Sequence, residues 1–477
     1  MRHPASWNQA AIPDGDQSAR RAVVKSSAMG SYAEIWLGSL HVATTKNEID
    51  PALMLLFRSS DKVVLDARTQ RDSMPSPVRE WAVGLELEDD EYPSVVFYKA
   101  PVTVIRDRLE LKGYTLPTAQ SALAAALSVI ANEYEPMVHG PSGDFFKPIF
   151  EVLRSGDVDQ WLSALKIINE RGLRPRQGGR HLGQSEHGAV VDFILENNWY
   201  EYVGPDLSVA LRLALEACSE RDELIYDVSD LVLCEEFAAD TDFVAYALDV
   251  SSVDYSSSSK TIVLTEGRTD SWIISESIKL LYPHLFEYFT FMDFEGARVA
   301  GGAGGLANMV KAFAGAGILN KVVAIFDNDT AAEAAIRSLR NIRLPTNIQI
   351  MKLPPCTSLN DYPTVGPSGP VTMNVNGIAG SIELYLGNDV LREEDSKLAP
   401  VQWTGYEAGV GKYQGEVLFK DRLHERFKKK LQASSEAEIL EASHWADIRL
   451  VLSTIFRVFH GFDEKHILSR INPPEDD

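Results

Sequence analysis

Acidic side chains follow two short apolar runs in the second half of the sequence. Glu266 comes directly after the run TIVLT, and Asp327 and Asp329 come after the run VVAIF. Runs of this length, bounded by Gly or Asp, are typical of buried parallel strands. Because ligands bind beyond the carboxyl ends of such strands, we expect the three side chains to share one crevice. Carboxylates gathered there repel one another unless a cation lies between them, and hard oxygen ligands favour Mg²⁺ or Mn²⁺.

The segment that begins at Lys260 alternates between strand and helix patterns. TIVLT leads to the helical pattern DSWIISESIKLL, EYFTFM precedes a glycine loop and GLANMVKAFAGAGI, and VVAIF precedes TAAEAAIRSLRNI and a closing IQIMKL. This order predicts right-handed βαβ units and a parallel four-stranded sheet with flanking helices, an α/β fold. Asp270 lies near the start of the first helix, and we expect it on the same side as Glu266.

These residues and their spacing resemble the Toprim domain, the metal-binding Rossmann-like fold shared by topoisomerases, bacterial primases and a class of nucleases. The resemblance covers about a quarter of the chain and rests on the glutamate in TEGRTD and the DxD motif in FDNDTA. Within that group the arrangement is most similar to OLD-type (overcoming lysogenisation defect) nucleases. Their pattern adds an aspartate four residues after the glutamate, a later acidic residue and a helical lysine. The matching residues are Asp270, Glu383 in SIELYL and Lys420 in GEVLFKDRL.

The resemblance implies a site for one or two Mg²⁺ or Mn²⁺ ions. The implied metal ligands are Glu266, Asp270, Asp327, Asp329 and Glu383. Catalytic roles are implied for Glu266, Asp327, Asp329 and Lys420. Ions in such a site orient a phosphodiester, lower the pKa of a bound water and neutralise charge in the transition state. The lysine would add a positive charge beside a reacting oxygen, and its helix carries further Lys and Arg residues as a local basic patch.

The composition is that of an acidic globular protein. At 477 residues, the chain is long enough for about three domains. Its three cysteines are widely spaced and match neither a disulfide framework nor a zinc site, and His424, His444 and His460 are expected in structural or exposed positions. Without a long apolar run or a secretory signal, a cytoplasmic protein that does not enter the membrane is expected. The net charge of −22 is the main observation against a nucleic-acid partner.

The patterns divide the chain into five parts. We expect a flexible extension at 1–28, a small β-rich module at 29–112, a mainly helical domain at 113–253, the Toprim domain at 260–386 and a helical region at 387–477. Expected strands in the β-rich module include AEIWLGSL, KVVLDA, WAVGLEL and SVVFYKAPVTVI, with a short helix at DPALMLLF. The proline- and glycine-rich LPPCTSLNDYPTVGPSGP is expected as a loop, and the tail is expected to be helical from about Gln414. The start MGSYAEIWLGS is similar to a module found ahead of Toprim or HEPN ribonuclease domains in bacterial defence proteins.

Two other patterns point to different chemistry. Gly302, Gly304 and Ala307 fit the dinucleotide motif G-x-G-x-x-A, but the preceding strand ends near Phe294 and a Rossmann turn is tight, so a glycine loop that lines the crevice is favoured. Residues 180–187 begin with Arg and end with His, the loose R-x₆-H pattern of HEPN ribonucleases, which is frequent by chance.

The favoured hypothesis is a metal-dependent endonuclease that cuts DNA or RNA in a bacterial defence setting. One alternative is a Toprim-like module that binds metal or nucleic acid without cutting, as a sensor or scaffold for a partner. A second alternative is a HEPN-like ribonuclease that needs no metal. The resemblance also implies a homo-oligomer and a regulatory protein partner.

Overall fold

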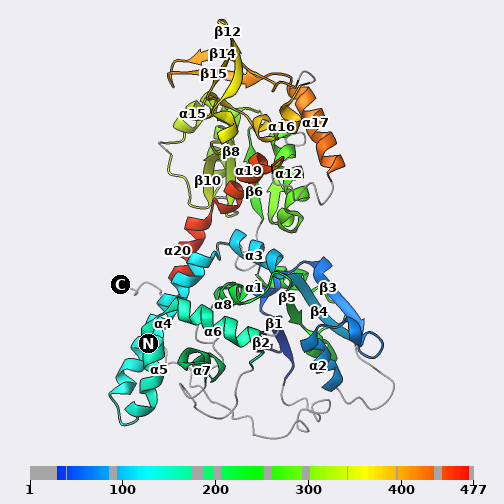
Figure 1. Cartoon of the computed structure of the whole chain (residues 1–477), viewed down its shortest axis with the longest axis vertical. Helices are drawn as coiled ribbons and strands as arrows, with labels where there is room; N and C mark the ends of the chain where they lie inside the picture. The colour runs from blue at the N-terminus through cyan, green and yellow to red at the C-terminus, as the bar shows by residue number, and fades with distance from the viewer. Residues whose placement is uncertain are drawn as a thin grey trace. The chain divides into compact units, whose positions relative to one another are not determined.

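The computed structural model describes residues 30–38, 40–84, 94–173, 186–196, 206–251, 260–292, 301–340, 342–393, 396–434 and 443–471. The extension expected at 1–28 lies outside these residues. Contacts divide the chain into two compact units, whose elements are labelled in Figure 1. Unit 1 comprises Met1–Ile105, Glu133–Val203 and Leu213–Asp249, and unit 2 comprises Arg106–Asn132, Gly204–Arg212 and Val250–Asp477.

A five-stranded antiparallel sheet lies in unit 1, with strand order β2-β1-β5-β4-β3. Its strands are β1 (Tyr32–Leu37), β2 (Leu40–Lys46), β3 (Lys62–Asp66), β4 (Ser94–Pro101) and β5 (Glu223–Asp227). The central strand, β5, comes from the segment that we expected to be helical. Because β5 is paired on both sides and covered on both faces, its residues from Leu224 to Asp227 are all buried, and no alternation marked it as a strand. The sheet therefore crosses the boundary expected after residue 112.

The segment WAVGLEL was expected as a strand, but its first four residues belong to helix α2 (Ser76–Gly84). Val78 and Ala82, four residues apart, are both buried in a cluster with Val95 and Phe97 of β4. That spacing is one helical turn, so packing on the sheet favours the helix.

The end of SVVFYKAPVTVI is also helical, because β4 stops at Pro101 and α3 (Val102–Leu111) begins directly after it. Val102, Ile105 and Leu109 are buried at helical spacing. The short helix expected at DPALMLLF is confirmed as α1 (Pro51–Met54), capped by the Asp50 side chain, which accepts a hydrogen bond from Leu53 N.

The middle of the chain is mainly helical, as expected. Its helices include α4 (Leu116–Val138), α5 (Gly143–Ser155), α6 (Val158–Glu170), α7 (Ala189–Glu196), α8 (Leu207–Ala214), α9 (Ser229–Leu233) and α10 (Phe243–Ser251). None of the helices among the described residues is long and apolar enough to span a membrane.

A four-stranded parallel sheet forms the centre of unit 2, which confirms the strand and helix order expected from Lys260 onward. Its strands are β6 (Thr261–Thr265), β7 (Phe289–Phe291), β8 (Val322–Phe326) and β10 (Ile348–Lys352), in the order β10-β8-β6-β7. The crossover helices are α12 (Arg268–Leu281), α14 (Ala303–Gly315) and α15 (Thr330–Arg337).

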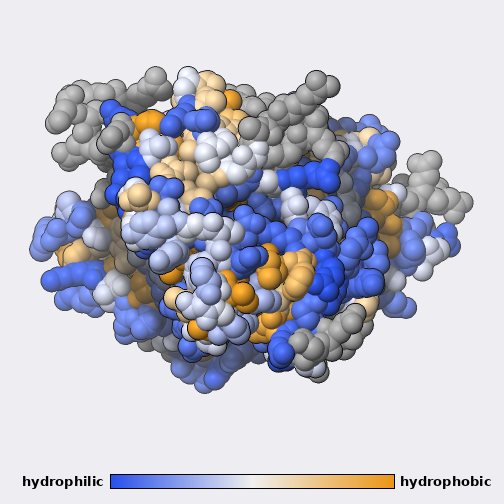
Figure 2. Space-filling model, turned by 90° about the horizontal axis from the view of Figure 1, so that it is seen from above, coloured by the Kyte–Doolittle hydropathy of each residue, from blue (hydrophilic) through white to orange (hydrophobic). Residues whose placement is uncertain are grey.

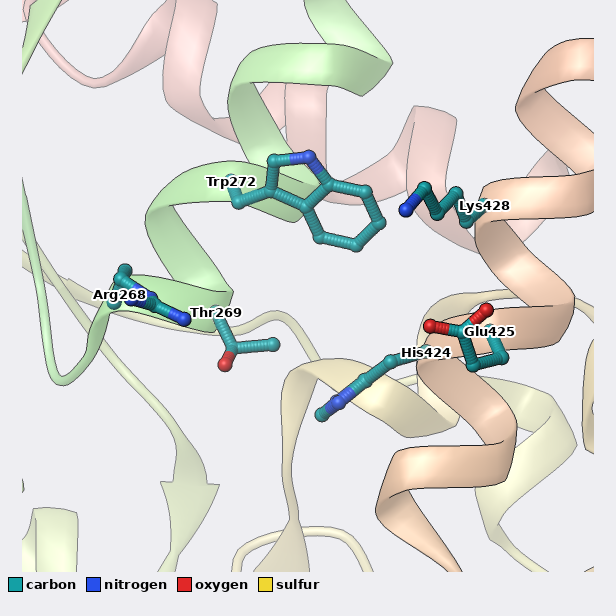
Figure 3. A pocket seen from close by; sticks show the side chains of 6 residues that line it. All are labelled: Arg268, Thr269, Trp272, His424, Glu425 and Lys428. Carbon is teal, nitrogen blue, oxygen red and sulfur yellow. The ribbon is translucent and has the colours of Figure 1, made fainter.

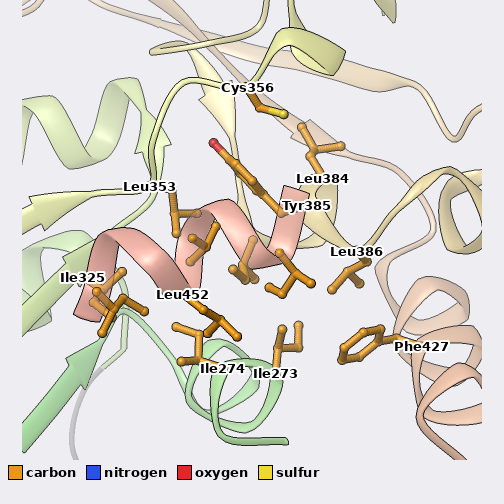
Figure 4. Packing of buried hydrophobic residues seen from close by; sticks show 14 of the residues in the cluster. Ile273, Ile274, Ile325, Leu353, Cys356, Leu384, Tyr385, Leu386, Phe427 and Leu452 are labelled. Carbon is orange, nitrogen blue, oxygen red and sulfur yellow. The ribbon is translucent and has the colours of Figure 1, made fainter. Parts of the chain in front are cut away.

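Alternate residues of β8 face two different cores. Val323 and Ile325 pack with α12 and with the C-terminal helix α19 (Ala446–Arg457), as Figure 4 shows for part of this cluster. Val322 and Ala324 pack on the opposite face with α14 and α15. The sheet is therefore buried on both sides, which explains why its strands are continuous apolar runs in the sequence.

A second sheet in unit 2 corrects two expectations. It contains β11 (Tyr362–Gly366), β12 (Gly369–Met373), β14 (Val401–Glu407) and β15 (Lys412–Val417), in the order β12-β11-β14-β15. The segment rich in proline and glycine thus contains a hairpin, which turns just before Gly369, whose φ is 91°. The region expected to be helical from 387 onward also contains two strands, β14 and β15, ahead of its longer helices.

The remaining elements of unit 2 are short or C-terminal. They are β9 (Asn328–Asp329), β13 (Ala379–Gly380), the 3₁₀ helix η8 (Ile382–Tyr385), α16 (Asn388–Leu391), α17 (Lys420–Ala433) and α20 (His460–Ile471). The second sheet exposes Val371, Met373, Tyr406 and Tyr413. Figure 2, a view from above, shows orange residues among blue and white ones.

Candidate metal centre

Glu266 and Asp327 meet at the carboxyl ends of two adjacent parallel strands. Glu266 follows β6 and Asp327 follows β8, which pair in parallel with Thr265 beside Ile325. One carboxylate oxygen of Glu266, Oε1, accepts a hydrogen bond of 2.9 Å from the backbone N–H of Asp327. The proximity expected from the strand pattern is therefore present, and the two side chains lie at one edge of the sheet.

Asp270 and Asp329 lie at the starts of the two helices that follow these strands. Asp270 is in the first turn of α12. Asp329 is the N-cap of α15, and its Oδ1 accepts a 2.7 Å hydrogen bond from Ala332 N. Helix starts favour carboxylates, because the N–H groups and the helix dipole attract negative charge.

Glu383 and Lys420 come from later elements and lie at the same edge. Glu383, in η8, is only 4% exposed, and Lys420 is the first residue of α17. The charge of Lys420 acts on the carboxylates of Glu266, Asp270 and Asp329 as well as on that of Glu383. All six residues singled out from the sequence are therefore brought together.

Burial and mutual repulsion hold several of these carboxyls toward their protonated form. Burial, together with the charges of Asp329 and Asp270, raises the pKa of Glu266 to about 7. Burial and the charge of Glu383 raise the pKa of Asp270 to about 7. The pKa of Asp327 is raised well above its ordinary value by burial and by the carboxylates around it. Mainly through burial, the pKa of Asp329 is raised as well. Such crowding is expected where a cation belongs.

Glu383 differs from its neighbours because it has a partner for its charge. Its Oε1 lies 3.0 Å from Nε2 of His424, one turn after Lys420 on α17. Burial opposes ionisation, but the hydrogen bonds and the Lys420 ammonium outweigh it and lower the pKa of Glu383 to about 2. Burial likewise opposes the charge on Lys420, and the surrounding carboxylates raise its pKa. Glu383 and Lys420 thus form the charged part of the cluster.

His424 was assigned only a structural or exposed position from the sequence. Its contact with Glu383 depends on how α17 packs against η8, which no sequence spacing shows. The available signal was its position four residues after Lys420, which places the two on one face of the helix.

The carboxylate oxygens of the cluster are the kind of ligand that a hard divalent cation prefers. Among the described residues, no group of three or more His, Cys, Asp or Glu side chains is already arranged to hold a metal ion. Glu266 and Asp329 each use one oxygen to accept a backbone hydrogen bond, and each carboxylate has a second oxygen. Mg²⁺ and Mn²⁺ bind oxygen donors, and either ion would relieve the repulsion between these carboxylates. The residues present therefore fit such an ion.

The glycine loop borders this cluster. Gly302 N donates a 2.7 Å hydrogen bond to the carbonyl oxygen of Glu266, and Gly302 caps α14 with a φ of 85°. A side chain at Gly301 would approach the same carbonyl oxygen to 3.2 Å. The loop therefore passes close to the backbone at the end of β6, which is the place expected for it.

The basic patch expected on α17 is partly neutralised. Arg422 and Arg426 both pair with Glu393, at 3.1 and 3.0 Å, and Lys430 pairs with Asp389 at 2.9 Å. The structure does not place the two residues of the loose R-x₆-H pattern relative to each other, because Arg180 lies outside the described residues. His187 has its Nδ1 3.1 Å from Arg171 Nη1.

Comparison with known proteins finds a match in the N-terminal part of the chain. Residues 29–251 match the family model described as HEPN/Toprim N-terminal domain 1. This match supports the expected HEPN/Toprim-associated module, and it extends past residue 112 to include β5, in agreement with the shared sheet. It does not reach the carboxylates of unit 2. No curated protein and no solved structure gave a match.

Proposed function

We propose that the protein is a divalent-metal-dependent endonuclease that hydrolyses phosphodiester bonds of DNA or RNA, with residues 260–386 as a Toprim-type catalytic domain. The hydrogen bond between Glu266 and the backbone of Asp327 carries this proposal, because it brings the two acidic motifs to one end of a parallel sheet. The name of the matched N-terminal domain, which pairs HEPN with Toprim, supports nuclease-type activity.

The roles of the residues follow from their chemistry. The ligands of one or two Mg²⁺ or Mn²⁺ ions would be Glu266, Asp270, Asp327, Asp329 and Glu383. A bound ion supplies a more acidic water and neutralises charge on the phosphodiester. Lys420 holds a positive charge beside the carboxylates and would stabilise a reacting phosphate oxygen. His424 orients Glu383 through the contact between Nε2 and Oε1.

The biological setting is part of the same proposal. The likeness to OLD-type nucleases and to bacterial defence proteins suggests an anti-phage role in the cytoplasm. The same likeness suggests a homo-oligomer and a regulatory protein partner.

A second candidate is a Toprim-like module that binds metal or nucleic acid without cutting it. The ion pairs of Arg422 and Arg426 with Glu393 favour this reading, because they reduce the positive charge available to phosphate. The two candidates share the cluster and differ in whether a bond is broken.

Incubation with nucleic acids separates them. Plasmid, single-stranded DNA and tRNA would be incubated with Mg²⁺ or Mn²⁺, with and without chelator, for the wild type and for Asp327→Ala. We expect cleavage that the chelator and the substitution both abolish. Circular dichroism would show that the variant keeps its fold.

The other outcomes are equally informative. Metal-dependent retention of nucleic acid without cleavage would identify the binding module instead. Cleavage that persists in chelator and is lost in His187→Ala would identify a HEPN-like ribonuclease and contradict the proposal.

A further inference from the structure

A pocket of about 250 Å³ opens between α12 and α17, beside the carboxylate cluster. It is lined by Arg268, Thr269, Trp272, His424, Glu425 and Lys428. Figure 3 shows that the first three side chains come from the start of α12 and the last three from α17, with the space between the two helices. We call this the α12–α17 pocket.

The α12–α17 pocket and the cluster share structural elements. Arg268 and Thr269 stand between Glu266 and Asp270 in the sequence, in the first turn of α12. His424 lines the pocket, and its Nε2 contacts the buried carboxylate of Glu383. A ligand in the pocket would therefore lie directly beside a substrate held at the cluster.

The side chains of the pocket differ in depth. Thr269, Trp272 and His424 are half-buried, whereas Arg268, Glu425 and Lys428 are exposed. The Trp272 ring is held edge-on against Phe427, with 5.9 Å between ring centroids, so the indole has a fixed position. A fixed aromatic side chain with cations at the rim suits a ligand that has both a flat ring and a negative charge.

We propose that the α12–α17 pocket binds one nucleotide of an unpaired strand, with its phosphate at Arg268 and Lys428 and its base against Trp272. This inference rests on the proposed function, since it names the class of substrate for the same site. A base can stack on an aromatic side chain only when it is not held within a double helix, so the occupant is a single-stranded segment. Glu425 at the rim repels phosphate, which restricts the phosphate to the side of the two cations.

Binding without metal tests the pocket separately from cleavage. A fluorescently labelled single-stranded oligonucleotide would be titrated in EDTA, with anisotropy as the readout, for the wild type and for Lys428→Ala. We expect affinity to fall severalfold and the slope of log K against log salt to decrease by about 0.7, the value for one phosphate contact on a single strand. Lys279→Ala is the matched control, because it removes an exposed lysine of α12 outside the pocket, paired with Glu276.

The aromatic side chain has its own test. Trp272→Leu keeps an apolar side chain against Phe427 and removes the stacking surface. We expect its affinity for the oligonucleotide to fall at least about fivefold, while a duplex of the same sequence shows no comparable loss. Thermal unfolding of the variant would show whether the fold is retained, and Trp272→Phe, which keeps an aromatic ring, should recover much of the affinity.

The results overturn the inference in defined ways. Equal losses in Lys428→Ala and Lys279→Ala would show only a general effect of charge, and equal binding of duplex and single strand would exclude an unpaired occupant. Pocket-dependent binding by a protein that never cleaves would refute the nuclease and keep the pocket. Cleavage and binding that both survive Lys428→Ala and Trp272→Leu would refute the pocket and keep the nuclease. A wild type that binds no single-stranded oligonucleotide in EDTA would refute the pocket, whereas only the cleavage assay with metal decides the nuclease.

Discussion

Each of the two units buries a carboxyl whose pKa is raised to about 7, and the surroundings of the two carboxyls differ. In unit 1, Asp227 at the end of β5 has its pKa raised mainly by burial and, to a smaller extent, by the charges of Glu34 and Asp230, while its Oδ1 accepts hydrogen bonds from the backbone N–H and the hydroxyl of Ser229 that favour ionisation. In unit 2, Glu266 has its pKa raised by burial and by the charges of Asp329 and Asp270.

The difference shows why a raised pKa alone does not identify a functional site. Asp227 has two hydrogen bonds from Ser229 that stabilise its ionised form, so it can carry a charge without an added cation. Glu266 belongs to a set of carboxyls that cannot all ionise together without an added cation. We therefore assign a structural role to Asp227 and a ligand-binding role to Glu266.

The largest expected effect is on cleavage. Glu266→Gln keeps an oxygen that can accept the hydrogen bond from Asp327 N but removes the charge. We expect it to reduce metal-dependent cleavage at least about 100-fold, because it weakens the binding of the ion that neutralises charge on the phosphodiester. Asp227→Asn, the equivalent change in unit 1, should leave cleavage within about twofold in the same initial-rate assay. A Glu266→Gln protein with wild-type rates would remove the distinction between the units.

The next effect is stabilisation by metal. Mg²⁺ at about 100 times its Kd should stabilise the wild type by about 2.7 kcal/mol against thermal unfolding, and Glu266→Gln should gain much less. The affinity should increase as the pH rises through 7, because Glu266 and Asp270 must lose protons before they bind a cation. Equal stabilisation of both proteins by Mg²⁺ would place the ion elsewhere.

A smaller effect concerns pH and Asp227. The carboxyl has a pKa of about 7 in the folded protein and 3.8 as its ordinary value, so the stability that it contributes at low pH is lost as the pH rises through 7. From about pH 5 to about pH 8, the wild type should therefore lose roughly 2 kcal/mol that Asp227→Asn does not lose. Calorimetry across that range measures the difference, and parallel stability curves for the two proteins would contradict it.

The smallest effect compares two helix caps. Asp157 in unit 1 caps α6 by accepting a 3.0 Å hydrogen bond from Gln160 N, much as Asp329 caps α15 in unit 2. Asp157→Ala should cost about 1 kcal/mol in urea unfolding and leave cleavage unchanged. Asp329→Asn keeps a good cap and should cost only a few tenths of a kcal/mol, yet it should impair cleavage. A cleavage rate unaffected by Asp329→Asn would show that Asp329 only caps α15 and has no role in cleavage.

The sequence predicted the parallel sheet and the meeting of Glu266 with Asp327, because both follow from short-range patterns. Each apolar run is followed by its own acidic residue, and parallel strands bring their carboxyl ends to one edge. The contact of His424 with Glu383 joins two elements whose packing has no such rule. The hairpin of β11 and β12 was hidden because Pro363, Gly366 and Gly369 are typical of loops but here belong to two short strands, of which β12 is largely exposed.

The late arrival of β5 has a consequence for biosynthesis. The ribosome must deliver the chain through Asp227 before β1 and β4 acquire the strand that separates them. Until then the strand pairs β1–β2 and β3–β4 each leave unpaired the edge that β5 will cover, and such edges are prone to pair with other chains. A stop codon shortly after residue 112 should therefore yield aggregates rather than a small folded domain, and chaperone demand should fall only once the closing strand has emerged.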